Sequence, residues 1–208
     1  MRRQPIFGRI RTVHFVGIGG NGMSSMAEVL LRRGYGVTGS DASLSPVTEH
    51  LAELGATVYE GHSASHVGDV DAVVYSSAVN PNANAETMEA SRRRLPVIKR
   101  AVLLGELMRM HFGIGIAGTH GKTTTTTLTG LVVQGGGFDP TIIVGGKVSA
   151  FGSNAVAGQG DIVVLEADEY DRTFLRLTPS IAVITNVETD HLDTYKDLID
   201  IEDAFVQY

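Results

Sequence analysis

The chain has 208 residues, 43% of them hydrophobic and none of them cysteine, and its 17 Lys and Arg against 23 Asp and Glu give a net charge of −6. This length and composition suit one large domain or two small ones, and the acidic balance argues against a general nucleic-acid-binding protein and against a polybasic membrane-surface protein. A cysteine-free chain has no disulfide scaffold, cysteine zinc site or cysteine nucleophile, and because no run of about 18 apolar residues occurs, we expect a cytoplasmic protein without a membrane partner.

The first half of the chain alternates short apolar runs with helical stretches, which is the pattern of a mostly parallel sheet covered by helices. Strands are predicted at 12–16, 36–39, 57–59, 72–76 and 97–98, and helices at 23–33, 46–54, 85–93 and 101–110. The helix over 46–54 has clear ends, because Ser45 is a good N-cap, Pro46 fits the first helical position and Gly55 fits the C-cap.

A second α/β series begins after residues 110–112. Strands are predicted at 113–117, 141–144, 161–166 and 181–186, with helices at 123–133 and 196–208. We therefore expect one domain over 1–110 and another over 111–208. The second has only four predicted strands, and its last helix reaches Tyr208 without a Gly, Asn or Pro stop signal. The chain is thus expected to be the N-terminal piece of a longer protein, and a short natural domain whose last helix frays is the alternative.

The segment Gly17-Ile18-Gly19-Gly20-Asn21-Gly22 follows a predicted strand and opens a predicted helix. It satisfies the pattern G-x-G-x-x-G in the required context, since glycines let a diphosphate approach the backbone and the helix N-terminus supplies free N–H donors. Asp41 follows the next strand, where an acid accepts a hydrogen bond from a ribose hydroxyl in NAD sites. The motif predicts diphosphate binding, and a glycine turn without a ligand is the alternative.

A second glycine loop, Ala117–Thr124, stands between the strand at 113–117 and the helix at 123–133. Lys122 can reach β- and γ-phosphates held by the loop backbone, and the Thr123 hydroxyl can ligate Mg²⁺. The loop has the short form G-x-x-G-K-T, because Ile116 stands where the usual pattern has its first glycine. The candidate ATP-binding residues are Gly118, Thr119, His120, Gly121, Lys122, Thr123 and Thr124. His120 either contacts the substrate or only fills the loop.

Acidic residues follow the next strands of this series. Glu166 ends the strand at 161–166 and is the expected metal ligand beside a phosphate-binding loop, whereas Asp168, Glu169 and Asp171 fit a solvated acidic turn. His191 lies among acids beyond the strand at 181–186, so a role toward Mg²⁺ or phosphate and a structural role are both open, and Mg²⁺ prefers oxygen ligands. Two nucleotide-type loops on successive units suggest that a nucleotide-carried substrate is acted on with ATP.

The chain resembles the Mur ligase family over nearly its whole length. The resemblance rests on segments that occur in the family's order, namely His14–Ser24, Gly39–Asp41, Gly61–His62, Ser76–Ala78, Ala117–Thr126, Glu166–Glu169 and Asn186–Asp193. The short glycine-lysine loop is the family's own signature. The resemblance implies a Rossmann-like parallel-sheet domain for a UDP-sugar, then the first part of a P-loop α/β ATPase domain, and a third domain for which this sequence has no counterpart.

The resemblance also implies the reaction, an ATP-dependent, C–N bond-forming ligation of L-alanine to UDP-N-acetylmuramate in peptidoglycan synthesis, with Mg²⁺ as cofactor. It implies catalytic roles for Lys122, Glu166 and His191, and metal binding by Thr123, Glu166 and His191. The UDP-sugar residues it implies are Gly17, Gly19, Gly20, Asn21, Gly22, Met23, Ser24, Asp41, His62, Ser76 and Ser77. Without the third domain, we expect the chain to bind the UDP-sugar but to turn over ATP and L-alanine negligibly.

Other functions remain open at this point. A family member that recycles a tripeptide onto the same nucleotide sugar is the nearest alternative. An NAD-dependent oxidoreductase would use the first glycine loop and Asp41 but leaves the segment Gly118–Thr124 unexplained. A non-catalytic nucleotide-binding module predicts binding without product, and a regulatory ATPase predicts hydrolysis independent of any sugar nucleotide.

Overall fold

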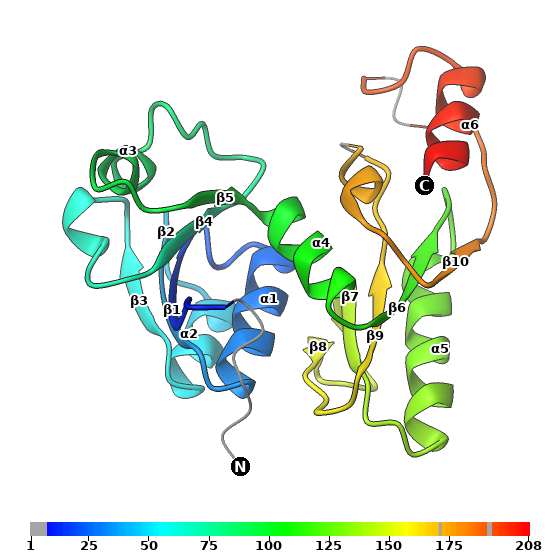
Figure 1. The fold of residues 1–208 in the computed structure, drawn as a ribbon, viewed down its shortest axis with the longest axis horizontal. Coiled ribbons are helices and arrows are strands. Elements are labelled where there is room, and N and C mark those ends of the chain that lie inside the picture. Colours follow the sequence, from blue (N-terminus) through cyan, green and yellow to red (C-terminus); the bar gives the residue numbers. More distant parts are fainter. Residues whose placement is uncertain (1–7, 171, 191–192) are drawn as a thin grey trace. The chain divides into compact units, whose positions relative to one another are not determined.

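The computed structural model describes residues 8–170, 172–190 and 193–208. The chain divides into two compact units, Met1–Leu103 and Leu104–Tyr208, each with its own sheet (Figure 1). The division falls inside helix α4 (Arg100–Arg109), several residues before the boundary expected from the sequence. The predicted α/β class is confirmed, because strands and helices alternate along both units.

Unit 1 is a five-stranded parallel sheet with helices packed against it. Its elements are β1 (Thr12–Val16), α1 (Asn21–Arg32), β2 (Gly36–Asp41), α2 (Pro46–Glu53), β3 (Thr57–Glu60), the 3-10 turn η1 (Ala64–His66), β4 (Ala72–Tyr75), α3 (Ala85–Arg92), β5 (Val97–Lys99) and the start of α4. The strand order is β3-β2-β1-β4-β5. The chain therefore runs outward from β1 to β3 and then returns to the other side of β1. The strand order reverses between β1 and β4, and α/β sheets bind ligands at the carboxyl ends of the strands at such a switch point.

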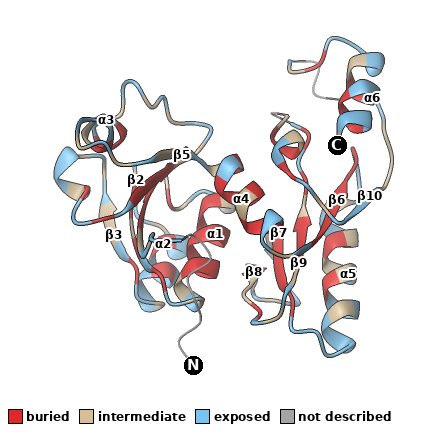
Figure 2. Ribbon diagram, in the orientation of Figure 1, coloured by how far each residue is buried: buried red, intermediate tan, exposed pale blue. Residues whose placement is uncertain are grey.

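Strand β1 lies at the centre of this sheet and is buried from Val13 to Val16 (Figure 2). A parallel strand covered on both faces reads as a continuous apolar run rather than an alternating one. His14 is the exception, since it is polar and 0% exposed. Helix α1 adds Met26 and Leu30 to the same core, both 0% exposed.

Helix α2 begins where the sequence predicted. The Ser45 hydroxyl accepts a hydrogen bond from Thr48 N and the Thr48 hydroxyl accepts one from Ser45 N, so the two form a reciprocal capping box. Leu54, rather than Gly55, is the C-cap residue. Gly55 follows it with a φ of +105°, a left-handed conformation that only glycine adopts without strain.

Unit 2 is also five-stranded, with the order β10-β6-β9-β7-β8. After the rest of α4, its elements are β6 (Phe112–Ala117), α5 (Lys122–Gly135), β7 (Thr141–Val148), β8 (Ser153–Val156), β9 (Ile162–Glu166), the 3-10 turn η2 (Thr173–Arg176), β10 (Ile181–Ile184) and α6 (Leu198–Gln207). The first four strands in that order run parallel, and β8 pairs antiparallel with β7. The carboxyl ends of β10, β6 and β9 therefore stand side by side at one edge.

The sequence prediction of four strands in this unit is wrong, because β8 is a fifth. Ser153 and Asn154 begin β8, and such small polar residues have little strand preference of their own. The strand forms because β7 extends through Gly145 and Gly146 to Val148 and offers a partner across a short turn. Tertiary pairing has overridden the local signal.

Helix α5 contains five consecutive threonines, which are poor helix formers. Packing holds them in the helix, since Thr126 is 0% exposed and Gly130 lies close against Ile142 of β7. The Thr127 hydroxyl also donates to the Thr123 carbonyl one turn earlier, at 2.7 Å. Over the described residues, no helix combines the length and apolar character that crossing a bilayer requires.

Candidate nucleotide sites

The first glycine loop turns sharply at the carboxyl end of β1. Gly17 has a φ of +80°, and the N–H groups of Gly17 and Ile18 both donate to the Ser40 carbonyl, at 2.8 and 2.9 Å. Gly20 is the N-cap of α1 and makes no side-chain cap. The first N–H groups of a helix have no partner within the helix, so the start of α1 offers donors that a bound anion can use.

Asp41 closes this loop from the end of β2. Its Oδ2 atom accepts a hydrogen bond from Gly19 N at 2.7 Å. A Cβ added to Gly19 would lie 2.9 Å from the same oxygen, so a side chain at residue 19 would displace the carboxylate from this position. The structure thus brings Asp41 to the glycine loop, while its contact with a ribose or uridine stays a prediction.

Two further side chains border the loop. Because β4 lies next to β1, Ser76 follows β4 at the loop, and a Cβ on Gly17 would lie 3.3 Å from Ser76 Oγ. The guanidinium of Arg100, which is half-buried, occupies the space that a Cβ on Gly22 would need. The sequence did not point to Arg100, because it lies far along the chain from the loop that it contacts.

The remaining predicted UDP-sugar residues are placed in different ways. Met23 and Ser24 are only 1% and 3% exposed, so their side chains face the core of unit 1. Ser77 is exposed, and the side chain of Asn21 lies outside the described part of the structure. Ligand contacts by these residues stay predictions.

His62 belongs to a polar group that we call the Glu86 cluster, formed by Glu86, His14, Ser40, His62 and His66. Glu86 is 0% exposed; its Oε2 lies 2.6 Å from Ser40 Oγ and 3.0 Å from His62 Nδ1, and its Oε1 lies 3.0 Å from His66 Nδ1. Burial raises the pKa of the Glu86 carboxyl, but the polar groups of His14, Ser40 and His62 outweigh it and lower that pKa to about 2. His14 Nε2 lies 3.6 Å from Oε1, which is longer than a hydrogen bond.

The second glycine loop follows β6 and leads into α5. Gly118 and Gly121 have φ angles of +131° and +81°, and Gly121 is the N-cap of α5. A Cβ on Gly118 would collide with Thr185 and approach the backbone of Asn186, so glycine is required by space as well as by conformation. The sequence prediction of a strand, a glycine loop and a helix is confirmed in the structure.

The segment after β10 fastens this loop in place. Asn186 accepts at its carbonyl from Thr119 N (3.0 Å) and at its side-chain oxygen from His120 N (2.9 Å). The Thr185 hydroxyl donates to the His120 carbonyl at 2.6 Å, and Thr119 Oγ1 accepts from Glu188 N at 2.9 Å. The loop is therefore held by side chains and backbone before any ligand arrives.

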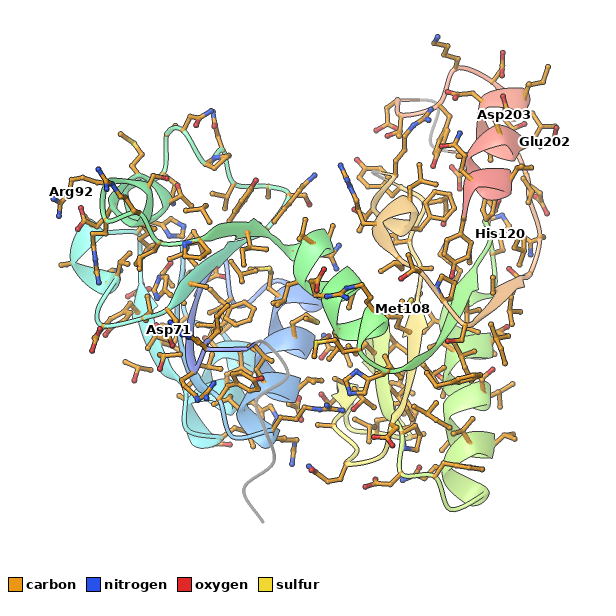
Figure 3. All side chains as sticks on the ribbon, in the orientation of Figure 1. Asp71, Arg92, Met108, His120, Glu202 and Asp203 are labelled. Atoms are coloured by element: carbon orange, nitrogen blue, oxygen red, sulfur yellow. The ribbon has the colours of Figure 1, made fainter. Side chains whose placement is uncertain are left out.

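His120 lies beyond the end of β6, where Figure 3 labels it. Its side chain is 66% exposed, and its Nε2 lies 3.8 Å from the equally exposed carboxylate of Glu188. This exposure leaves both roles of His120, contact with a substrate and filling of the loop, as predictions.

Lys122 is held by its own loop and by Glu169. Its Nζ donates to the carbonyl of Gly118 at 2.7 Å and lies 2.8 Å from Glu169 Oε2; the two side chains are only 12% and 3% exposed. The Tyr195 hydroxyl donates to the Glu169 carbonyl at 2.7 Å and is itself buried, which raises the pKa of Tyr195 to about 12.

The prediction of a solvated acidic turn is therefore wrong for Glu169. Asp168 is exposed as predicted, and Asp171 lies outside the described residues. Glu169 is buried because its charge is neutralised by Lys122, which is 47 residues away in sequence. A local cluster of acids gives no sign of such a distant partner.

Glu166 and Thr123 meet at the mouth of the second loop. The Thr123 hydroxyl lies 3.1 and 3.0 Å from the two Glu166 carboxylate oxygens, and Gly145 N donates to Oε2 at 2.8 Å. Among the described residues, no group of three or more His, Asp or Glu side chains is assembled as a metal site. His191, the third predicted metal ligand, lies outside the described residues.

Each unit thus carries a glycine loop between a parallel strand and a helix, and the second adds the lysine, threonine and acid of a nucleoside triphosphate site. These features are typical of α/β proteins that bind phosphorylated ligands. The chain belongs to the Mur ligase family. The model for the Mur ligase family catalytic domain matches residues 12–112, and the model for the Mur ligase middle domain matches residues 116–207.

The names of similar proteins agree with this family assignment. The chain is 68% identical over all 208 residues to the UDP-N-acetylmuramate–L-alanine ligase of Salinibacter ruber, and it spans 44% of that protein's length. It resembles the crystal structure of UDP-N-acetylmuramate-alanine ligase from Thermotoga maritima, with a TM-score of 0.85 and 33% identity over 94% of this chain and 46% of that one. It also resembles the UDP-N-acetylmuramate:L-alanyl-γ-D-glutamyl-meso-diaminopimelate ligase from Neisseria meningitides, with a TM-score of 0.84 and 31% identity over 95% of this chain and 67% of that one.

Proposed function

We propose that this chain supplies the UDP-sugar site and the phosphate loop of an ATP-dependent ligase that joins L-alanine to UDP-N-acetylmuramate. The observation that carries the proposal is that one chain contains two different glycine loops. The loop of unit 2 has Lys122, Thr123 and Glu166 beside it, and the loop of unit 1 is of the type that binds a diphosphate. The 68% identical Salinibacter ruber relative, named for this reaction, supports the choice of substrates.

The chemistry explains why such a protein needs a triphosphate. The lactyl carboxylate of UDP-N-acetylmuramate is a poor electrophile, so one of its oxygens first takes the γ-phosphoryl group of ATP, which releases ADP. The amine of L-alanine then attacks the carbonyl carbon of the acyl phosphate. The tetrahedral intermediate loses phosphate and the amine loses a proton, which leaves the amide.

Within that scheme, Lys122 leaves Glu169 and binds the β- and γ-phosphates, where its charge stabilises the transferring group. The backbone from Gly118 to Thr124 holds the phosphate oxygens. In unit 1, Gly17–Gly22 hold the diphosphate of the UDP-sugar, with Asp41 and His62 toward the uridine and Ser76 and Ser77 beside the loop. These roles are those that the family resemblance implies for the residues at these positions.

The donor set at Thr123 and Glu166 fits Mg²⁺, since a hydroxyl and a carboxylate converge within about 3 Å and are oxygen ligands of the kind it prefers. His191 is the proposed third member of that set. Bound Mg²⁺ would neutralise phosphate charge during transfer. The Thr123 hydroxyl in the first turn of α5 and the Glu166 carboxylate at the end of β9 would hold the ion there.

Calorimetry on the chain tests the proposal. We expect saturable, one-to-one binding of UDP-N-acetylmuramate and no comparable binding of NADH. Saturable binding of NADH with no binding of the UDP-sugar would replace this proposal with an oxidoreductase.

A further inference from the structure

The Glu86 cluster contains a buried carboxylate for which the fold alone gives no reason. A buried, ionised carboxylate is costly unless donors surround it, and an apolar residue of similar size would often serve stability as well. Here the donors come from three different segments, with Ser40 near the end of β2, His62 after β3 and His66 in η1. The cluster therefore ties together loops that end at the ligand-binding edge of the sheet.

The charge state of Glu86 determines where the hydrogens lie. Because the neighbouring groups hold the pKa of Glu86 at about 2, the carboxylate is ionised at neutral pH and only accepts hydrogen bonds. His62 and His66 each approach it through Nδ1, at 3.0 Å. His62 Nδ1 also lies 2.9 Å from Ser40 Oγ, but the one hydrogen of that hydroxyl is donated to Glu86 Oε2. Both rings therefore carry a hydrogen on Nδ1, and in a neutral ring this leaves Nε2 with a free lone pair.

Of the histidines in the cluster, His62 is the one placed to use that lone pair. His14 is 0% exposed and the His66 side chain is 18% exposed, with its ring stacked on Tyr59 at 4.4 Å between centroids. The His62 side chain is 30% exposed. It follows Gly61, whose N–H donates to the Asp41 carbonyl at 2.7 Å, so His62 stands beside the residue that closes the glycine loop.

We propose that Glu86 is a positioning residue that fixes the ring and tautomer of His62, so that His62 Nε2 accepts a hydrogen bond from the nucleoside of the UDP-sugar. The proposal rests on the proposed function of unit 1 as a UDP-sugar site. The ligand group it requires is a donor, which uridine offers as the uracil N3–H or the ribose 2′-hydroxyl. Cytosine has an acceptor at N3, so a contact of His62 Nε2 with the base would also favour uridine over cytidine.

The test is calorimetric titration of UDP-N-acetylmuramate into the chain and into Glu86→Gln, His62→Ala, the double variant and His66→Ala. One lost hydrogen bond is worth about tenfold in affinity, so Glu86→Gln and His62→Ala should each weaken binding by about tenfold. The double variant should bind no more weakly than His62→Ala alone. His66→Ala is the matched control: it removes a donor from the same carboxylate, and its affinity should stay within about twofold.

Wild-type affinity in Glu86→Gln, or additive losses in the double variant, would overturn the proposal. Failure of the wild-type chain to bind would instead refute the UDP-sugar site itself. A folding defect in Glu86→Gln does not block the test, because ¹⁵N NMR of the wild-type His62 ring reports its tautomer directly. We expect the Nδ1–H form, and an Nε2–H form would contradict the assignment.

Titration of UDP, 2′-deoxy-UDP and CDP separates the two donors. If His62 contacts the base, CDP binds the wild type more weakly than UDP does, and this difference disappears in Glu86→Gln. If His62 contacts the ribose 2′-hydroxyl, 2′-deoxy-UDP binds the wild type more weakly than UDP does, and that difference disappears in Glu86→Gln. Equal affinity of all three for both proteins would overturn the proposal.

Discussion

Replacing Glu86 with glutamine should change how the stability of unit 1 depends on pH. The pKa of Glu86 is lowered from its ordinary value of 4.5 to about 2, because the donors around it favour the charged form more than burial disfavours it. A depressed folded-state pKa contributes stability that is fully present above pH 4.5 and is lost as the pH falls toward 2. At 1.36 kcal/mol per unit, this shift is worth about 3 kcal/mol, of which about 2 kcal/mol is lost between pH 5 and pH 3.

Urea unfolding at pH 5 and pH 3, followed by the NMR signals of the histidines of unit 1, measures this difference without interference from unit 2. We expect the unfolding free energy of the wild type to fall by about 2 kcal/mol more than that of Glu86→Gln over this interval. Glu60→Gln, which removes an exposed carboxylate from β3, serves as the control and should follow the wild type. Parallel losses in the wild type and Glu86→Gln would refute the reasoning about the cluster.

Three further changes test other parts of the account. Gly118→Ala places a side chain against Thr185 at a residue with a positive φ, so we expect the free energy of unfolding of unit 2 to fall by several kcal/mol. An unchanged melting temperature would contradict the loop geometry. Lys122→Met leaves Glu169 without its partner and should lower the free energy of unfolding of unit 2 by about 3 kcal/mol, part of which the added Glu169→Gln should restore. Additive effects of the two substitutions in this double-mutant cycle would show that the pair is not coupled. Asp41→Ala should weaken UDP-N-acetylmuramate binding in calorimetry, and an unaltered affinity would exclude Asp41 from the site.

The elements that carry the two loops could be predicted from the sequence because their signals are local. Strands β1 and β6 are short apolar runs followed directly by glycines, and the start of α2 is visible in Ser45 and Pro46. Strand β8 escaped prediction because Ser153 and Asn154 have no strand preference and depend on pairing with β7.

The polar partners of the site could not be predicted, because they are set by contacts between distant segments. Lys122 and Glu169 meet only when β6 and β9 lie side by side in the sheet. Glu86 looks like an ordinary acid in the first turn of a helix, and nothing near it in sequence indicates that Ser40 and His62 will surround it. Charge neutralisation after folding, rather than local composition, decided which acids are buried.

The most direct test of the whole account is a crystal structure of this chain grown with UDP-N-acetylmuramate. The account predicts diphosphate density against the backbone of Gly17–Gly22 at the start of α1, with the uridine on the side of Asp41 and His62. A ligand bound elsewhere on unit 1, or an empty glycine loop at ligand concentrations that saturate the protein in solution, would contradict it.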